Sequence, residues 1–206
     1  MKLSNNPYRS SKITLPYICI HDYFTEQELN YIEEISKTKA LNRATIVSQQ
    51  NGLVVSDAPI RVSNNSFHAY NEQNSWFFEK MNAAIESVNN SVYGFELYGY
   101  KDYQYTEYEG SENGKYGVHM DLIMTEAKPA DLLDTRKLSI TLLLSEPEKD
   151  FTGGDFRIYE GANPTVVEAR KGTIIFFPSF MLHEVTPVLT GTRKSIVVWV
   201  EGPKFK

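Results

Sequence analysis

Short apolar runs alternate with turn residues through the second half of the chain, and this pattern limits the fold more than any other feature. The runs that are typical of strands lie at residues 95–108, 138–145, 156–159, 165–168, 173–177, 182–185 and 193–200. The glycines between or within these runs are Gly153, Gly154, Gly161, Gly172 and Gly191. Many short strands in series are typical of a β-sandwich or a jelly roll. We therefore expect a β core in this half of the chain.

The first half carries two helix signals. Thr25 is followed three residues later by Glu28, which is a capping-box pattern, and apolar residues continue after it at helical spacing. A second helix is predicted over about 75–88, and Asn89-Asn90 ends it. The sequence thus predicts an α+β fold, in which N-terminal helices support a jelly-roll core.

The length of the chain and its charge set further limits. The 206 residues suffice for one domain, and we expect a single domain over 1–206, with a helical support region at 1–94 and the β core at 95–203. The net charge of -5 and the lack of a Lys/Arg run disfavour nucleic acid as a partner. The oligomeric state stays open.

Cysteine content and hydropathy narrow the class of protein. Cys19 is the only cysteine, so an internal disulfide and a cysteine-rich zinc site are excluded. The first residues form no signal-peptide pattern, and no run of about 18 apolar residues is present that could span a bilayer. We therefore expect a cytoplasmic protein with no membrane partner.

The histidines give the strongest functional signal. His119 and Asp121 are two residues apart, so on a strand their side chains point to the same face and can bind one ion. His183, after an apolar strand, is the best third ligand. Two imidazoles and one carboxylate leave coordination positions open and suit Fe(II) oxygen chemistry. His21 and His68 are interpreted as structural.

A second candidate group follows the last histidine. Arg193 stands ten residues after His183, and Ser195 is two residues further on. A three-residue hairpin loop at 190–192 would pair Leu189 with Arg193 and turn Arg193 toward the metal, whereas a two-residue loop would turn it outward. A guanidinium can clamp a carboxylate through two hydrogen bonds, and a hydroxyl adds a third. A dicarboxylate that chelates the metal would then be held at both ends.

Together these motifs resemble the Fe(II)/2-oxoglutarate-dependent dioxygenases, most closely the prolyl 4-hydroxylase-like branch. The resemblance covers about 95–203. Its elements, in order, are Tyr105-Thr106-Glu107-Tyr108, the segment 114–121 that contains the His-x-Asp pair, the run 138–145, Phe151-Thr152-Gly153-Gly154-Asp155-Phe156, Phe177-Pro178 before His183, and Gly191-Thr192-Arg193 with Trp199. The resemblance implies a double-stranded β-helix of two sheets that holds the metal and the cosubstrate inside.

The resemblance also implies roles for particular residues. The implied ligands of Fe(II) are His119, Asp121 and His183. Arg193, with Ser195 beside it, binds the distal carboxylate of 2-oxoglutarate. Tyr108, or less closely Tyr105, is the tyrosine that touches 2-oxoglutarate, and Tyr116 is a pocket residue. Leu143 departs from the pattern, because many relatives carry a polar residue there, and Ser139 or Thr141 would replace its contacts.

The implied activity is hydroxylation of a prolyl residue in a protein or peptide substrate. In this reaction 2-oxoglutarate and O2 are converted to succinate and CO2, and ascorbate is an implied accessory cofactor. Two polar segments, 47–58 and 124–136, correspond to the loops that cover the substrate, and we expect them to be mobile. Arg61 and Trp76 are interpreted as structural rather than as groove residues.

Three alternatives stay open from the sequence. The same chemistry could act on a small molecule, a free amino acid or a nucleobase. A catalytically silent β-barrel binding module is the alternative of another class, although such a protein would normally lose a ligand or the anchoring arginine. A zinc hydrolase would need a general base beside the metal, and Glu184, next to His183, should point to the opposite face of its strand.

Overall fold

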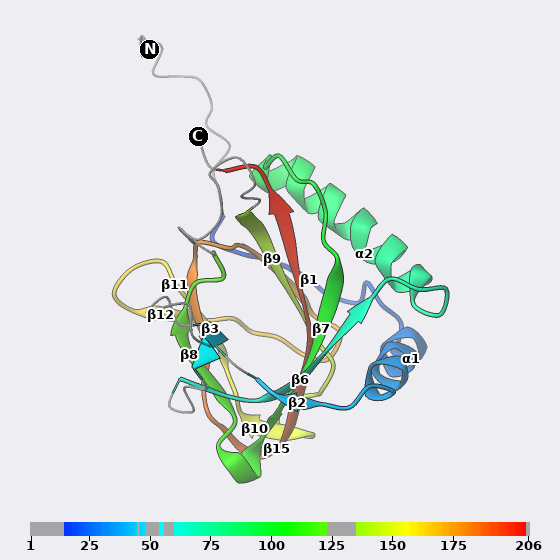
Figure 1. Cartoon of the computed structure of the whole chain (residues 1–206). Coiled ribbons are helices and arrows are strands. Elements are labelled where there is room, and N and C mark those ends of the chain that lie inside the picture. Colours follow the sequence, from blue (N-terminus) through cyan, green and yellow to red (C-terminus); the bar gives the residue numbers. More distant parts are fainter. Residues whose placement is uncertain (1–14, 45, 48–53, 56–59, 123–134, 205–206) are drawn as a thin grey trace.

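The computed structural model describes residues 15–44, 46–47, 54–55, 60–122 and 135–204 (Figure 1). Its helical elements are α1 (Glu26–Lys37), α2 (Ser75–Val88), the π-helical turn η1 (Asn89–Tyr93) and the 3-10 turn η2 (Gly110–Glu112). Of the predicted mobile segments, 48–53, 56–59 and 124–134 lie outside the described residues. No helix in the described ranges is both long and apolar enough to cross a membrane.

The larger of two antiparallel sheets runs in the order β1-β13-β9-β15-β7-β6-β2, and β10 pairs with the N-terminal end of β15. Its strands are β1 (Ile18–Ile20), β13 (Ile174–Pro178), β9 (Thr135–Leu143), β15 (Val188–Gly202), β7 (Asp102–Glu109), β6 (Asn64–Ala69), β2 (Asn42–Arg43) and β10 (Phe151–Gly153). The strands that are absent from this sheet lie in a second sheet and in a short two-stranded ladder.

The second sheet runs in the order β12-β11-β14-β8-β5. Its strands are β12 (Pro164–Val166), β11 (Phe156–Tyr159), β14 (Leu182–Val185), β8 (Lys115–His119) and β5 (Arg61–Val62), and a separate small ladder joins β3 (Ile46–Val47) to β4 (Val54–Val55). Side chains of both sheets meet in one buried cluster that includes Tyr108, Phe156, Phe177 and Val185. The two sheets therefore form a jelly roll, which confirms the predicted fold class.

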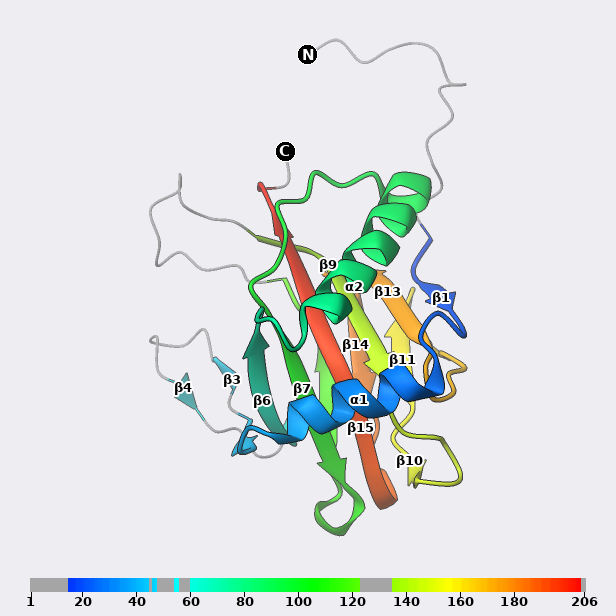
Figure 2. The same cartoon turned by 90° about the vertical axis from the view of Figure 1, so that its right-hand side faces the viewer.

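The two helices cover the outer face of the larger sheet (Figures 1 and 2). Alternation along each strand separates two cores, because successive side chains point to opposite faces. On β9, Ile140 and Leu142 join the cluster that packs against the helices, whereas Leu143 joins the cluster between the sheets. The helix-side core leaves the inner face of the larger sheet available for polar side chains.

The predicted capping box at the start of α1 is confirmed. The backbone N–H of Glu28 donates to the Thr25 hydroxyl at 3.2 Å, and the backbone N–H of Thr25 donates to the Glu28 carboxylate at 2.7 Å. The same carboxylate accepts from Lys80 of α2 at 2.8 Å. One side chain thus caps the first helix and links it to the second.

The second helix covers the predicted residues, but the chain continues into the π-helical turn η1. Gly94, with a φ of 65°, ends this turn in the left-handed region that glycine tolerates. Asn89 then holds Phe95 through two hydrogen bonds of 2.9 Å, one from its side-chain amide and one to it. The strand was predicted to begin at residue 95 but begins only at Asp102. The backbone of Phe95 is instead hydrogen-bonded to Asn89.

The predicted hairpin at 190–192 is wrong. β15 continues as one strand through Gly191, which has a φ of 71°. The reason is non-local, since β10 lies beside this end of β15 and Phe151 pairs with Gly191. Arg193 pairs instead with Tyr108 of β7. Likewise, Thr135 and Arg136, assigned to a polar loop, form the start of β9.

The N-terminal region supplies strands as well as helices. β1 pairs with β13, β6 pairs with β7, and β5 pairs with β8 in the second sheet. The support region is therefore continuous with both sheets of the core.

His68 is a buried histidine in β6 that lies far from the metal-site histidines in sequence. It is 3% exposed, its ring stacks on Tyr103 with centroids 4.9 Å apart, and its Nε2 lies 2.8 Å from the Ser66 hydroxyl. Burial, together with the charge of Lys39, lowers the pKa of His68 from 6.5 to about 4. His68 is therefore neutral in the folded protein at neutral pH.

We predict that His68 makes the fold acid-sensitive. Between pH 6.5 and 4 the unfolded chain binds a proton at this residue that the native state does not, so the free energy of unfolding falls as the pH falls. The expected loss is about 1–3 kcal/mol. Urea unfolding at several pH values measures it. His68→Gln should flatten the dependence, whereas His21→Gln, at an exposed position, should not.

Candidate metal centre

The predicted triad comes together where β8 and β14 pair. His183 and His119 are register partners across these strands, and their ring centroids lie 4.1 Å apart. Asp121 follows β8 and reaches both rings, with carboxylate oxygens 3.7 Å from His119 Nε2 and 3.5 Å from His183 Nε2. The three possible ligand atoms all lie within 4.8 Å of one another. No other group of three such residues in the described ranges could hold a metal.

Backbone carbonyls fix the orientation of both imidazoles. His119 Nδ1 lies 2.8 Å from the carbonyl oxygen of Gly117, and His183 Nδ1 lies 2.9 Å from that of Met181. A carbonyl only accepts, so each Nδ1 carries the proton and donates. Each Nε2 is then left with a lone pair that points toward Asp121, as a metal ligand requires.

The electrostatics of the triad favour the ligand forms. Burial alone would raise the pKa of Asp121, but the charges of His183 and His119 and a hydrogen bond from Ser139 outweigh it and lower this pKa. Burial, followed by the charge of His183, lowers the pKa of His119. Asp121 is therefore an ionised carboxylate and His119 a neutral imidazole at neutral pH. This donor set fits Fe(II) and leaves positions free for other ligands.

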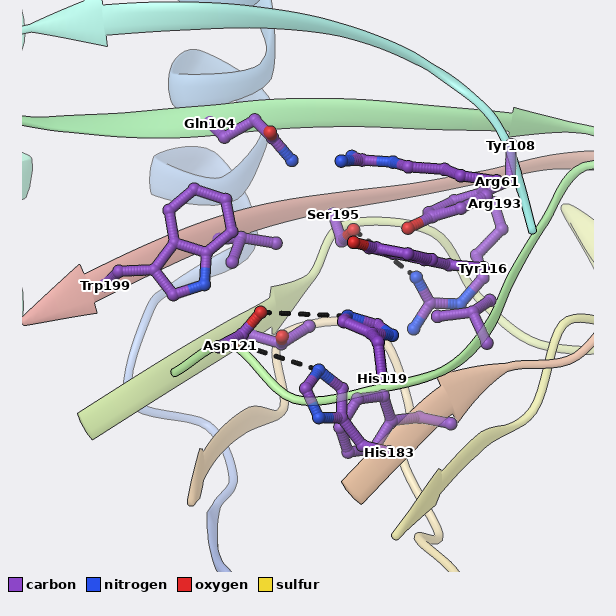
Figure 3. A pocket seen from close by; sticks show the side chains of 14 residues that line it. Arg61, Gln104, Tyr108, Tyr116, His119, Asp121, His183, Arg193, Ser195 and Trp199 are labelled. Carbon is purple, nitrogen blue, oxygen red and sulfur yellow. Dashed lines mark hydrogen bonds and ion pairs between the residues drawn. The ribbon is translucent and has the colours of Figure 1, made fainter. Parts of the chain in front are cut away.

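Arg193 lies in the same pocket as the triad (Figure 3). The pocket is lined by residues of both sheets: Arg61, Gln104, Tyr108, Tyr116, His119, Asp121, Thr141, Phe156, His183, Val185, Arg193, Ser195, Val197 and Trp199. Arg193 is 2% exposed, and it donates from Nε to the Gly154 carbonyl at 3.0 Å and from Nη1 to the Ser195 hydroxyl at 3.3 Å. Its guanidinium carbon is 5.7 Å from the centre of the Tyr108 ring. The structure thus gathers all the predicted site residues.

Comparison with known proteins now identifies the domain. Residues 103–201 match the family model of the 2OG-Fe(II) oxygenase superfamily. This segment, just under half of the chain, is thus similar to the 2OG-Fe(II) oxygenases. The match to this family implies Fe(II), 2-oxoglutarate and O2, as predicted. Ascorbate stays a prediction.

Three proteins illustrate what the chain is similar to. A PKHD-type hydroxylase from Alteromonas mediterranea is 36% identical over 93 residues, which cover 45% of this chain and only 40% of that relative. A prolyl-4-hydroxylase from Pseudomonas putida superposes with a TM-score of 0.67 at 18% identity, covering 92% and 94% of the two chains. A prolyl hydroxylase from Trichoplax adhaerens, solved with a hypoxia inducible factor peptide fragment, gives 0.69 at 16% identity and covers 91% and 84%. At these identities the structures establish the shared fold.

The end of the oxygenase pocket nearest the triad is lined by aromatic rings and cations. Tyr116 stacks on His119 with centroids 3.4 Å apart, and the Arg61 guanidinium lies 4.6 Å from the Tyr116 ring centre. Burial raises the pKa of Tyr116 to about 12, so its hydroxyl stays protonated and can donate. Arg61, interpreted from the sequence as structural, therefore lines the pocket.

Trp199 and Arg136 form a second cation–aromatic pair. The Arg136 guanidinium lies 4.0 Å from the Trp199 ring centre. The indole Nε1 of Trp199 is buried and has no hydrogen-bond partner within the described part of the chain. Figure 3 shows this nitrogen on the side of the ring that faces Asp121, at the opposite end of the pocket from Arg193. The pocket thus contains a buried N–H donor without a partner, on the side that faces Asp121.

Several secondary candidates lie elsewhere. Tyr105 is on the helix side of β7 and donates to Glu107 at 2.6 Å, which leaves Tyr108 as the pocket tyrosine. Leu143 is buried between the sheets, and Thr141 supplies the polar lining. Glu184 accepts from the Tyr159 hydroxyl at 2.8 Å and is not among the pocket-lining residues. It is therefore not placed to act as the general base that a zinc hydrolase would need.

Trp199 and Gln104 are among the pocket residues that sequence reasoning missed. Trp199 was noted only as part of the resemblance, yet it follows Arg193 and Ser195 at even spacing on one strand. That parity places it on the same face and was a usable signal. Gln104 carries the same signal, because it lies four residues before Tyr108 on the predicted strand and so shares its face.

We predict that Asp121→Ala destroys the metal site. The variant loses the one anionic ligand, so its affinity for Mn(II), used as an air-stable probe of the Fe(II) site, should fall by more than about 100-fold. Calorimetric titration of the purified protein measures this affinity. The control is His21→Ala, an exposed histidine outside the pocket, which should bind like the original protein. Equal affinity in the Asp121 variant would contradict the assignment.

Proposed function

We propose that this protein is an Fe(II)- and 2-oxoglutarate-dependent dioxygenase that hydroxylates a prolyl residue in a protein or peptide. The observation that carries the proposal is a buried guanidinium in the pocket of the triad. No carboxylate forms an ion pair with Arg193 in the described ranges, while burial lowers its pKa. An unpaired buried cation is costly, so the site is built for an anionic ligand.

Two groups of residues would bind the two ends of the proposed cosubstrate. His119, Asp121 and His183 would hold Fe(II), and 2-oxoglutarate would bind beside it. Arg193 binds the distal carboxylate, with Ser195 as a further donor and Tyr108 beside the guanidinium. Bound Fe(II) supplies the O2-dependent oxidation that converts 2-oxoglutarate to succinate and CO2 and hydroxylates the substrate. The chain itself sets the geometry and excludes water from the buried pocket.

The opposite end of the pocket supports a substrate rich in acceptors. Trp199 Nε1 and the Tyr116 hydroxyl can donate, and Arg61 carries donors that never accept. A prolyl residue within a chain has carbonyl acceptors on both sides and no N–H, and its ring packs well on aromatic faces. The pocket chemistry therefore matches a prolyl segment. The prolyl hydroxylases among the structural neighbours add support for a peptide substrate.

The reaction can be tested by following succinate. Protein loaded anaerobically with Fe(II) should convert 2-oxoglutarate to succinate once O2 is admitted, and a proline-rich peptide should stimulate turnover. Asp121→Ala should abolish it. Slow conversion that no proline peptide stimulates would retain the dioxygenase and reject the prolyl substrate in favour of a small molecule, free amino acid or nucleobase. No conversion and no binding of 2-oxoglutarate would favour the non-catalytic binding module.

We predict that Trp199→Phe weakens peptide binding selectively. The phenylalanine ring keeps a face for Arg136 but loses the buried Nε1–H. The KM for the peptide should rise about tenfold, the equivalent of roughly 1.4 kcal/mol for one hydrogen bond. The KM for 2-oxoglutarate should stay unchanged. Trp76→Phe is the matched control, because Trp76 Nε1 is also buried and unpartnered in the described ranges but lies in the helix layer.

A further inference from the structure

Two glycines follow each other where β10 ends and the chain turns toward β11. Gly153 has a φ of 70° and Gly154 a φ of 63°, so both adopt the left-handed conformation that side chains disfavour. The backbone N–H of Gly154 donates to the carbonyl of Pro187 at 3.0 Å. This bond ties the turn to the residue just before β15. The turn is therefore held against the strand that carries Arg193.

The carbonyl of Gly154 is also the partner of the Arg193 side chain. Arg193 Nε donates to it at 3.0 Å, and Nη1 donates to Ser195 at 3.3 Å. Because the guanidinium is planar, two bonds to different nitrogens fix the orientation of its whole plane. Nη2 has no hydrogen-bond partner within the part of the chain that the structure describes. The donors left over are those that a ligand in the pocket can reach.

Gly154 also gives the arginine room. A Cβ built at this position would lie 2.9 Å from Val188 Cγ2, 3.0 Å from Arg193 Cδ and 3.2 Å from Phe151 Cε2. The second distance matters most, since it shows that the arginine stem crosses directly over the bare glycine. Any side chain there would push the stem away and break the bond from Nε to the carbonyl.

We propose that Gly154 is a positioning residue for 2-oxoglutarate. Its carbonyl and its missing side chain hold the Arg193 guanidinium at a fixed place and angle before the cosubstrate arrives. Preorganisation of this kind raises affinity because the ligand does not have to order the side chain. The inference rests on the proposed function, in which Arg193 binds the distal carboxylate.

The test is the binding of 2-oxoglutarate to the Mn(II)-loaded protein, measured by calorimetry without turnover. Gly154→Ala and Gly154→Asn should each bind 2-oxoglutarate at least tenfold more weakly, with unchanged affinity for Mn(II). In turnover, the KM for 2-oxoglutarate should rise while kcat at saturating cosubstrate is retained. Asparagine tolerates a positive φ better than alanine, so equal losses would show that the Cβ, not backbone strain, is responsible.

Gly94→Ala is the matched control. Gly94 has a φ of 65°, nearly that of Gly154, but a Cβ there would meet no atom within 4 Å. This variant experiences the same backbone strain far from the arginine and should bind 2-oxoglutarate like the original protein. Unchanged binding in the folded Gly154 variants would overturn the proposal.

A further variant separates the arginine from the general packing of the turn. Val188→Ala, added to Gly154→Ala, removes the valine contact and leaves the contact with Arg193 Cδ. If the double variant regained full affinity, the effect would run through Val188 and the proposal would fail. It would also fail if Mn(II) affinity fell together with that for 2-oxoglutarate, because the turn would then support the whole site. Original protein that binds Mn(II) but not 2-oxoglutarate would refute the proposed function itself.

Discussion

The two faces of β15 carry different chemistry, and the pairing register of this strand keeps them apart. Ile196, Val198 and Val200 enter the core under the helices, whereas Arg193, Ser195 and Trp199 face the pocket. A slip of one residue would place a guanidinium among the helix-side apolar groups and an isoleucine in the pocket. Pairing with β9 on one side and β7 on the other opposes such a slip. The chemistry of the site therefore depends on backbone hydrogen bonds along one strand.

The helix layer makes this division possible. Burial of large side chains of α1, α2 and the outer sheet face, such as Ile32, Phe77 and Tyr103, supplies apolar stabilisation at some distance from the metal centre. The inner face can then carry groups that cost stability when they are buried without a partner, such as Arg193 and the Nε1 of Trp199. In a fold without the helix layer, the single core between the sheets would have to provide both the apolar stabilisation and the ligand-binding side chains.

Local signals explain which parts could be predicted from the sequence. The cap at Thr25 and the His119–Asp121 pair depend on neighbours within three residues, and both were found where expected. The chain turn at 190–192 was mispredicted because Gly191 reads locally as a turn, whereas β10 supplies partners that allow the strand to continue. Arg193 faces the pocket even so. Its inward position comes from pairing with Tyr108 rather than from a hairpin loop.

The charges of the site explain why metal and cosubstrate should bind together. Asp121 and Arg193 are both buried and carry opposite charges toward the two ends of the pocket, while Arg61, which also lines it, adds a further positive charge. In the proposed function a doubly positive ion joins the aspartate end and a doubly negative 2-oxoglutarate spans the distance to the arginine. Either ligand alone would leave an uncompensated charge in surroundings of low polarity, which is costly. Each ligand therefore removes a penalty that the other would meet, and their affinities should be coupled by linkage. At the end of the pocket away from the metal, this coupling depends on the Arg193 guanidinium, which Gly154 and Ser195 hold in place.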